Sequence, residues 1–344
     1  MNNKIVKLEA LRGFAAVYVL FHHFRVGEGT ATAYFTMQGQ VAVILFFILS
    51  GFVIFYSCVK TAKLSFRAYF IKRFRRIYGV FLAALLVSYL AACIDARRWM
   101  PLNLGSLVLN LTNLQDLDRH PGCWFEGYYG NTPLWSISYE WWFYMLFYPL
   151  YRYVPEDRQR AVAVGISLFG LFSYEVFPNQ VSIILEYFLC WWTGVEIAKV
   201  WLKGEPLGLY RLRHIQYCLL AMIALLSVRV LVKGWSSVGE HPVIELRHYV
   251  YCYLLLVCGL IWRRMGWRFF NRTLLPFAAI APISYAIYVL HYPVVVKYTF
   301  SALKNPAFNL ALLLFVLCLL AYIVEVQGQK VINRWTDRFL RRPA

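Results

Sequence analysis

The chain has 344 residues, of which 60% are apolar and 18% aromatic, whereas only 15% are charged. This balance excludes an ordinary soluble domain, in which about a quarter of the residues carry a charge. The formal net charge is +18. In a soluble protein this charge would suggest nucleic-acid binding, but here membrane topology explains it, and we predict no nucleic-acid partner.

Ten runs of mostly apolar residues are each long enough to cross the hydrocarbon core of a bilayer, which requires about 17 to 25 residues. They lie near residues 10–25, 38–58, 79–95, 134–152, 161–177, 181–199, 214–233, 248–262, 276–296 and 308–327. The sequence therefore predicts an all-α fold, a polytopic membrane helix bundle of about ten transmembrane helices in contact with membrane lipids. We expect one transmembrane domain at 1–329 and a short basic cytoplasmic tail at 330–344.

The positions of Lys and Arg predict the orientation of the bundle. If the N-terminus is cytoplasmic, roughly three quarters of the 35 Lys and Arg residues fall in the alternate connections on the cytoplasmic side. Such a bias is typical of segments that stay inside, so we expect both termini in the cytoplasm.

The eight cysteines lie mostly within the predicted spans, where cysteine packs as a small apolar residue. Cys93, at the outer end of a span, and Cys123, in the long outer connection from 96 to 133, could form a disulfide, with simple packing as the alternative. This connection is rich in Gly, Pro and aromatic residues, and it is either a functional loop or a structural cap. No Cys or His spacing indicates a metal site, and we predict none.

The first apolar run contains Arg12, His22 and His23. In a helix, Arg12 and His23 share one face about 16 Å apart along the axis, whereas His22 lies roughly 80° away. Because ionisable groups are costly in lipid, we predict that Arg12 and His23 line a solvated passage. The alternative is that Arg12 obeys the positive-inside rule and the histidines lie at the outer interface.

Two further stretches combine apolar and small or basic residues. FFILSGFVI contains Ser50 and Gly51, whose small side chains favour close packing of helices. KRFRRIY contains Arg73 and Arg76 three residues apart, and such guanidinium pairs suit phosphate groups. Contact with anionic lipid headgroups is the alternative for these arginines.

Two stretches near the outer face also carry polar side chains. WSISYE places Ser136 and Glu140 on one helix face with Ser138 beside them, and a carboxylate within a membrane helix normally has a partner. ISYAIYVLH ends in His291, near the outer end of its span. Structural pairing with neighbouring helices is the alternative for both stretches.

Taken together and in this order, LRGFAAVYVLFHH, FFILSGF, the pair of arginines followed by Ile77, WSISYE and ISYAIYVLH resemble the motifs of acyltransferase family 3. These integral membrane enzymes modify extracytoplasmic glycans, and the resemblance covers essentially the whole chain. It implies a multi-pass enzyme of the inner or plasma membrane. The co-substrate would be acetyl-CoA or another acyl-CoA, and the acceptor a sugar hydroxyl of an extracytoplasmic polysaccharide or lipid-linked glycan.

The resemblance also implies roles for residues at matching positions. His23 would be the catalytic base, acting with Arg12, Ser136, Ser138 and Glu140. The coenzyme A phosphates would be bound by Arg12, Arg73 and Arg76, and the acceptor substrate by Trp135, Tyr285 and His291.

The sequence departs from the family pattern at two places. The family often has a proline shortly after a glutamate in the last span, whereas Glu325 is followed by Val326, Gln327 and Gly328. We therefore assign Glu325 no role. The proline that frequently follows the pair of arginines is also missing, because Tyr78 and Gly79 occupy these positions.

Two other classes of function remain as alternatives. A transporter or flippase of lipid-linked sugars would also need many spans and a polar path, although the sequence shows no repeated halves. A structural or sensory membrane subunit would not need His, Arg and Glu on inward faces. Self-association into a homo-oligomer is left open.

Overall fold

The computed structural model describes residues 3–23, 38–61, 64–298 and 305–340, and all regular secondary structure in these ranges is helical. The α-helices are α1 (Asn3–His23), α3 (Gly39–Val59), α4 (Phe66–Ala96), α5 (Leu104–Leu111), α6 (Trp135–Tyr153), α7 (Glu156–Val176), α8 (Gln180–Glu186), α9 (Phe188–Leu202), α10 (Arg213–Lys233), α11 (Val243–Arg264), α12 (Phe270–Thr273), α13 (Ser284–His291), α14 (Pro306–Ala321) and α15 (Gln329–Leu340). Short 3₁₀-helices cover η1 (Tyr128–Gly130), η2 (Thr132–Leu134), η3 (Leu275–Ala279) and η4 (Ala281–Ile283), and π-helices cover η5 (Tyr292–Val296) and η6 (Tyr322–Gly328).

Helical structure covers each of the ten predicted apolar runs, as far as the structure describes them. Within the described residues, six helices are long and apolar enough to cross a membrane: Gly39–Val59, Phe66–Ala96, Gln180–Leu202, Arg213–Lys233, Val243–Arg264 and Pro306–Asp337. The other predicted spans are more polar or are interrupted, because α1 and α7 begin with charged turns, α6 is rich in Trp and Tyr, and residues 275–296 form several short helices. The protein is thus an all-α, multi-pass bundle, whereas ten spans and cytoplasmic termini stay predictions.

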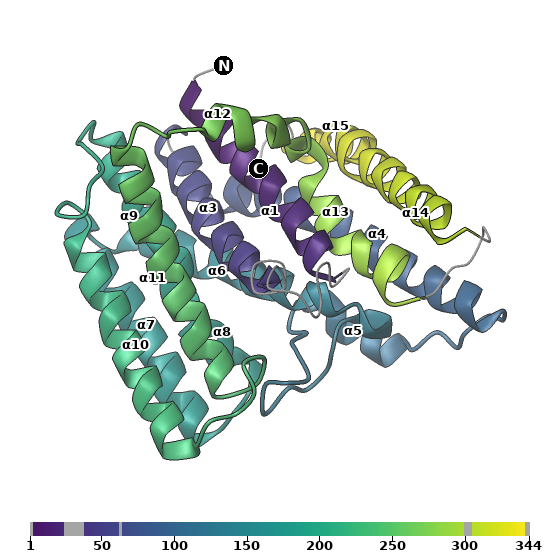
Figure 1. The fold of residues 1–344 in the computed structure, drawn as a ribbon, viewed down its shortest axis with the longest axis horizontal. Coiled ribbons are helices and arrows are strands. Elements are labelled where there is room, and N and C mark those ends of the chain that lie inside the picture. The colour runs from purple at the N-terminus through teal and green to yellow at the C-terminus, as the bar shows by residue number, and fades with distance from the viewer. Residues whose placement is uncertain (1–2, 24–37, 62–63, 299–304, 341–344) are drawn as a thin grey trace.

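Helices α1, α3 and α6 lie near the middle of the molecule in Figure 1, and α9 packs against α3. In that view α7 and α10 lie on one side, and α4, α14 and α15 lie on the other. Helices α3 and α9 approach closely because Gly51 and Gly194 have no side chain. A Cβ atom at Gly51 would meet the carbonyl oxygen of Trp191, and one at Gly194 would meet that of Ile48. This confirms the predicted packing role of Gly51.

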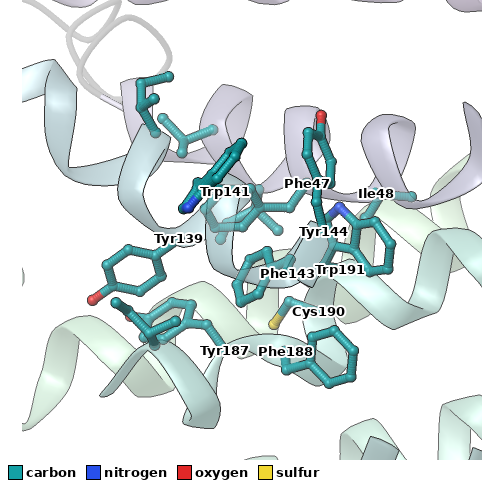
Figure 2. Packing of buried hydrophobic residues seen from close by; sticks show 14 of the residues in the cluster. Phe47, Ile48, Tyr139, Trp141, Phe143, Tyr144, Tyr187, Phe188, Cys190 and Trp191 are labelled. Atoms are coloured by element: carbon teal, nitrogen blue, oxygen red, sulfur yellow. The ribbon is translucent and has the colours of Figure 1, made fainter. Parts of the chain in front are cut away.

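Aromatic side chains fill the space between α3, α6 and α9 (Figure 2). The ring of Phe143 meets that of Phe47 edge-on at 5.3 Å between centroids, and it lies 6.1 Å from Trp191. Such pairs stabilise a fold by about 0.5–1.5 kcal/mol each beyond the burial of their area. These aromatic rings form a rigid apolar wall inside the bundle.

Helix α4 begins well before residue 79, where the sequence predicted the start of this span. Ser65 caps its N-terminus by accepting a hydrogen bond from the amide of Ala68 at 3.3 Å. The basic residues that follow are good helix formers, so the helix continues through them. As a consequence Arg73 and Arg76 lie inside a helix and not in a cytoplasmic loop.

The segment expected as a basic tail also contains a helix, because residues 329–340 form α15. It packs along α4, where Arg75 Nη1 lies 2.7 Å from Asp337 Oδ1. The side chain of Ile332 fills the space beside Gly79.

The long connection between α4 and α6 is ordered. It contains α5 and a set of buried polar side chains that includes Asn110, Gln115 and His120. Cys93 and Cys123 are both free, so the disulfide that we considered is not formed here. Instead, Cys93 Sγ accepts a hydrogen bond from the amide of Met100, and Cys123 Sγ donates one to the carbonyl of Phe125.

Candidate active site

A cavity of about 70 Å³ lies between α1, α3, α4, α6 and α13. Five residues that the sequence predicted as site residues line it: Arg12, Arg76, Ser136, Glu140 and Tyr285. Tyr144 and Tyr288 add hydroxyl groups, and α3 contributes an apolar wall. The fold therefore brings together residues that lie far apart in the sequence.

Glu140 is held in the cavity by hydroxyl groups, as the cost of a carboxylate inside a membrane protein requires. Its Oε1 atom accepts a hydrogen bond of 2.7 Å from Ser50 Oγ and another from the hydroxyl of Tyr144. The indole of Trp191 donates to Ser50 Oγ at 3.1 Å. Sequence reasoning assigned Ser50 to packing alone and missed this contact. The signal in the sequence that could have indicated this contact was the hydroxyl of Ser50 next to the closely packed Gly51.

Arg76 forms an ion pair with Glu325, to which we assigned no role. Arg76 Nη1 lies 2.8 Å from Glu325 Oε1, and the guanidinium lies over the ring of Tyr285. The Glu325 Oε2 atom accepts the amide hydrogen of Ala286 at 2.8 Å. The missing proline does not decide the contacts of Glu325, since a carboxylate in an apolar run needs a partner whatever its neighbours.

Arg12 enters the cavity from α1 and donates from Nη2 to the carbonyl of Ala281 at 2.9 Å. Pro276 and Pro282 keep the chain between α12 and α13 in short 3₁₀ turns instead of a continuous helix, and the Ala281 carbonyl also accepts a hydrogen bond from Ser284 Oγ. The backbones of α1 and η3 approach closely at Gly13, where a Cβ atom would meet the carbonyl of Phe277. The position of Arg12 is thus set by close backbone packing.

Arg73 does not line the cavity, although it lies only one turn from Arg76. Its guanidinium is buried over the rings of Tyr69 and Tyr144, and Nη2 lies 3.5 Å from Ser57 Oγ. Lys72 Nζ donates to the same hydroxyl at 2.9 Å. Among the described residues no carboxylate forms an ion pair with Arg73. Unlike Arg76, it keeps a positive charge that no described acidic group neutralises.

His23 also lies outside the cavity, at the far end of α1. Its ring centroid is 5.0 Å from that of His291 and 5.4 Å from that of Tyr292. His291 is buried, and its Nδ1 atom lies 2.7 Å from the carbonyl oxygen of Tyr288. Because a carbonyl only accepts, Nδ1 carries the proton and Nε2 has a free lone pair. Tyr288 lines the cavity, so Tyr288 and His291 lie between the cavity and His23.

Ser136, Ser138 and Trp135 are also predicted site residues, and they differ in whether they line the cavity. Ser136 Oγ lies 2.8 Å from the hydroxyl of Tyr288 and lines the cavity. Ser138 is fully buried and donates to the carbonyls of Gln115 and Trp135, each at 2.6 Å. The ring of Trp135 stacks on that of His248. Neither Ser138 nor Trp135 lines the cavity, which departs from the roles that we expected for them.

A second polar cluster, which the sequence reasoning did not find, joins the outer connection to the bundle. Asp116 Oδ1 lies 3.0 Å from His120 Nδ1, and the hydroxyl of Tyr139 donates to Asp116 Oδ2. Burial disfavours the imidazolium, but the carboxylates of Asp116 and Glu245 outweigh it and raise the pKa of His120 to about 9. Deeper in the cluster, Arg229 forms an ion pair with Glu186. In the described parts of the chain, no three His, Cys, Asp or Glu residues are grouped to hold a metal ion.

Comparison with known proteins assigns the fold and the cavity to a family. A family model described as an acyltransferase domain matches residues 5–326. The chain belongs to this family. The acyltransferase MdmB of Streptomyces mycarofaciens is 32% identical over 182 residues, which cover 48% of this chain and 46% of MdmB. The chain thus aligns with slightly less than half of that relative, and no solved structure matches it.

The match confirms the resemblance to acyltransferase family 3 that the sequence motifs indicated. The chain therefore belongs to an acyltransferase family, and its described part contains several apolar helices of membrane-spanning length. Because this cavity combines two arginines and a carboxylate, we take it as the candidate active site of the domain.

Proposed function

We propose that the protein is a membrane-embedded O-acyltransferase of the inner or plasma membrane. It moves an acyl group, most commonly acetyl, from cytoplasmic acyl-CoA to a sugar hydroxyl of an extracytoplasmic polysaccharide or lipid-linked glycan. The observation that carries the proposal is the cavity in which Arg12, Arg76, Ser136 and Glu140 meet within an acyltransferase domain. Membership of this family favours an enzyme over a transporter or flippase.

The donor would be bound in two parts. The cavity of about 70 Å³ is small beside the roughly 300–1,000 Å³ of pockets that enclose whole ligands, so it would take only the acyl end. The anionic phosphates would remain on the cytoplasmic side. There Arg73 and Lys72 are the better ligands, because Glu325 already neutralises Arg76. The thin pantetheine arm would then pass Tyr144, which contacts both Arg73 and Glu140.

The acceptor would approach from the outer side, where His23 and His291 lie. His23 would take the proton of the sugar hydroxyl as its oxygen attacks the thioester carbon. The C–S bond then breaks, and the coenzyme A thiolate leaves and takes up a proton. Arg12 and Ser136, at the cavity, would stabilise the negative charge on the carbonyl oxygen. Tyr288 and His291 separate His23 from the cavity. For transfer, these two side chains must therefore move so that the sugar hydroxyl can contact both His23 and the thioester.

Purified protein incubated with radiolabelled acetyl-CoA and a cell-surface glycan fraction tests this proposal. We expect label in the glycan, its loss with His23→Ala in protein that is still inserted, and substantial activity with the matched variant His22→Ala. Label transfer that His23→Ala leaves intact, or an equal loss in both variants, would reject His23 as the base. Absence of transfer by the unmodified protein would reject the acyl-CoA donor.

A further inference from the structure

Glu325 occupies an unusual position in the last long helix. The residues around it face outward, with Tyr322 and Ile323 about half exposed, whereas Glu325 is only 3% exposed. It lies in the π-helix η6, which joins α14 to α15. A π turn accommodates one extra residue and changes the direction of side chains, and such turns are frequent at functional sites. Here the carboxylate of Glu325 points into the bundle from a helix whose residues are mostly exposed.

Both carboxylate oxygens of Glu325 have partners on different elements. Oε1 pairs with Arg76 of α4, and Oε2 accepts from the amide of Ala286, the third residue of α13, each at 2.8 Å. The first amides of a helix have no partner within it, and they favour a negative charge. Glu325 therefore connects α4 and the start of α13 through a single side chain.

These two elements form facing walls of the cavity, and Glu325 itself does not line it. Arg76 contributes the guanidinium on one wall, and α13 contributes Tyr285 and Tyr288 on the other. The Arg76 guanidinium lies over the ring of Tyr285, 5.5 Å from its centroid. A free arginine side chain samples many rotamers, so a fixed carboxylate behind it selects the one that faces the cavity.

We propose that Glu325 is a positioning residue for acyl transfer. It acts through Arg76, whose guanidinium it holds at the cavity beside Glu140, and it does not touch the substrate. This inference rests on the proposed function, which it deepens by separating the two arginines: Arg73 binds the donor, whereas the pair of Arg76 and Glu325 shapes the site of transfer. Arg75 and Asp337 form a comparable ion pair on neighbouring elements, but Asp337 is half exposed and lies away from the cavity, so this pair provides a matched control.

A double-mutant cycle in the purified full-length protein tests this role, with kcat and the KM for acetyl-CoA as readouts. We expect Glu325→Gln to lower kcat at least about 10-fold while KM changes less than about 3-fold, because the donor phosphates are bound elsewhere. Since Glu325 acts through Arg76, the variant Arg76→Gln/Glu325→Gln should be no slower than Arg76→Gln alone. Glu325→Asp keeps the charge but is shorter, and it should recover part of the lost kcat. Asp337→Asn should match the unmodified protein.

Three results would overturn the inference. A kcat of Glu325→Gln within twofold of the unmodified enzyme would show that Arg76 needs no carboxylate. If the fold losses of kcat in the two single variants multiply in the double variant, Glu325 acts independently of Arg76. If Glu325→Gln elutes as an aggregate in size-exclusion chromatography, the Glu325→Asp variant provides the test instead. Full activity of Glu325→Asp would show that Arg76 needs no precisely placed carboxylate. An unmodified protein that transfers no label would reject the proposed function and with it this role, whereas the three results above require an active enzyme and leave the function standing.

Discussion

Each polar side chain of the cavity is held by a specific partner, and these partners distinguish reacting groups from supporting ones. Glu140 is held by two hydroxyls, Arg76 by a carboxylate and Arg12 by a backbone carbonyl. Ser136 bonds only to Tyr288, another residue of the cavity, and to a nearby carbonyl. The partner hydroxyl of Tyr288 itself lines the cavity, so a substrate there can take its place as the partner of Ser136.

The two serines of WSISYE should differ in their effects on transfer. We expect Ser136→Ala to lower kcat at least about 10-fold, because an oxyanion donor is lost from the cavity. Ser138→Ala should leave kcat within a few-fold and instead lower the unfolding temperature, because the serine bonds to the backbone of the outer connection. Kinetics and thermal unfolding of both variants check this. Equal kcat losses would contradict the assignment.

His120 makes stability depend on pH. Its pKa of about 9 in the folded protein lies above the ordinary value of about 6.5, so its contribution is complete below pH 6.5 and is lost as pH rises through 9. We expect the unfolding temperature of the unmodified protein to exceed that of His120→Gln at pH 6.5, with the gap narrowing by pH 10. A gap that stays constant over this range would show that the imidazole is neutral throughout.

The sequence predicted much of the site but not its partners. Arg12, Arg76, Ser136, Glu140 and Tyr285 line one cavity, and this agrees with the expectation that ionisable and hydroxyl groups on apolar helices face the interior. The sequence placed Ser138 beside Ser136, but residues two apart on a helix point about 200° away from each other, and Ser138 does not line the cavity. The pairing of Arg76 with Glu325 joins residues 249 positions apart, and no local pattern reveals it.

At the scale of elements, the apolar runs located the helices, whereas their ends and interruptions depended on other signals. Helix α4 extends into the basic segment because hydrophobicity marks the part in lipid and not the end of the helix. The run at 276–296 contains Pro276, Pro282 and Pro293, which divide it into short helices. The carbonyl that binds Arg12 belongs to Ala281, the first residue of one of these short helices, η4.

The contact between α3 and α9 should be intolerant of added volume. Gly51→Ala would press a methyl group against the carbonyl of Trp191, and backbone atoms cannot move aside as a flexible side chain can. We expect a lower unfolding temperature and a loss of transfer, since Ser50 next to it holds Glu140. The control Gly165→Ala lies on α7 with open space around it, and it should be neutral or slightly stabilising. A Gly51→Ala protein as stable as this control would contradict the close approach.

At the scale of the whole molecule, the proposed transfer requires the bundle to separate a cytoplasmic donor side from an outer acceptor side. The bias of Lys and Arg predicts both termini inside, with the connection between α4 and α6 outside. Arg73 and Lys72 then lie in the cytoplasmic half, and His23 and His291 near the outer face. The order of these groups across the bilayer agrees with the direction of the proposed transfer.

Membrane-impermeant maleimide labelling checks this topology in intact cells. In a variant without its eight native cysteines, we expect Asp118→Cys to be labelled from outside. Tyr210→Cys, in the connection before α10, should be labelled only after permeabilisation. Both side chains are exposed in the folded chain, so access depends on the membrane alone. The reverse pattern would invert the bundle and place the phosphate ligands on the wrong side.

The position of a bound donor tests the central claim most directly. In a cryo-electron microscopy structure of the protein with a non-hydrolysable acetyl-CoA analogue, we predict the phosphates beside Arg73 and Lys72 and the acetyl group in the cavity between Arg12 and Glu140. An analogue whose acetyl group lies outside that cavity, or whose phosphates lie at the outer face beside His23, would contradict the account.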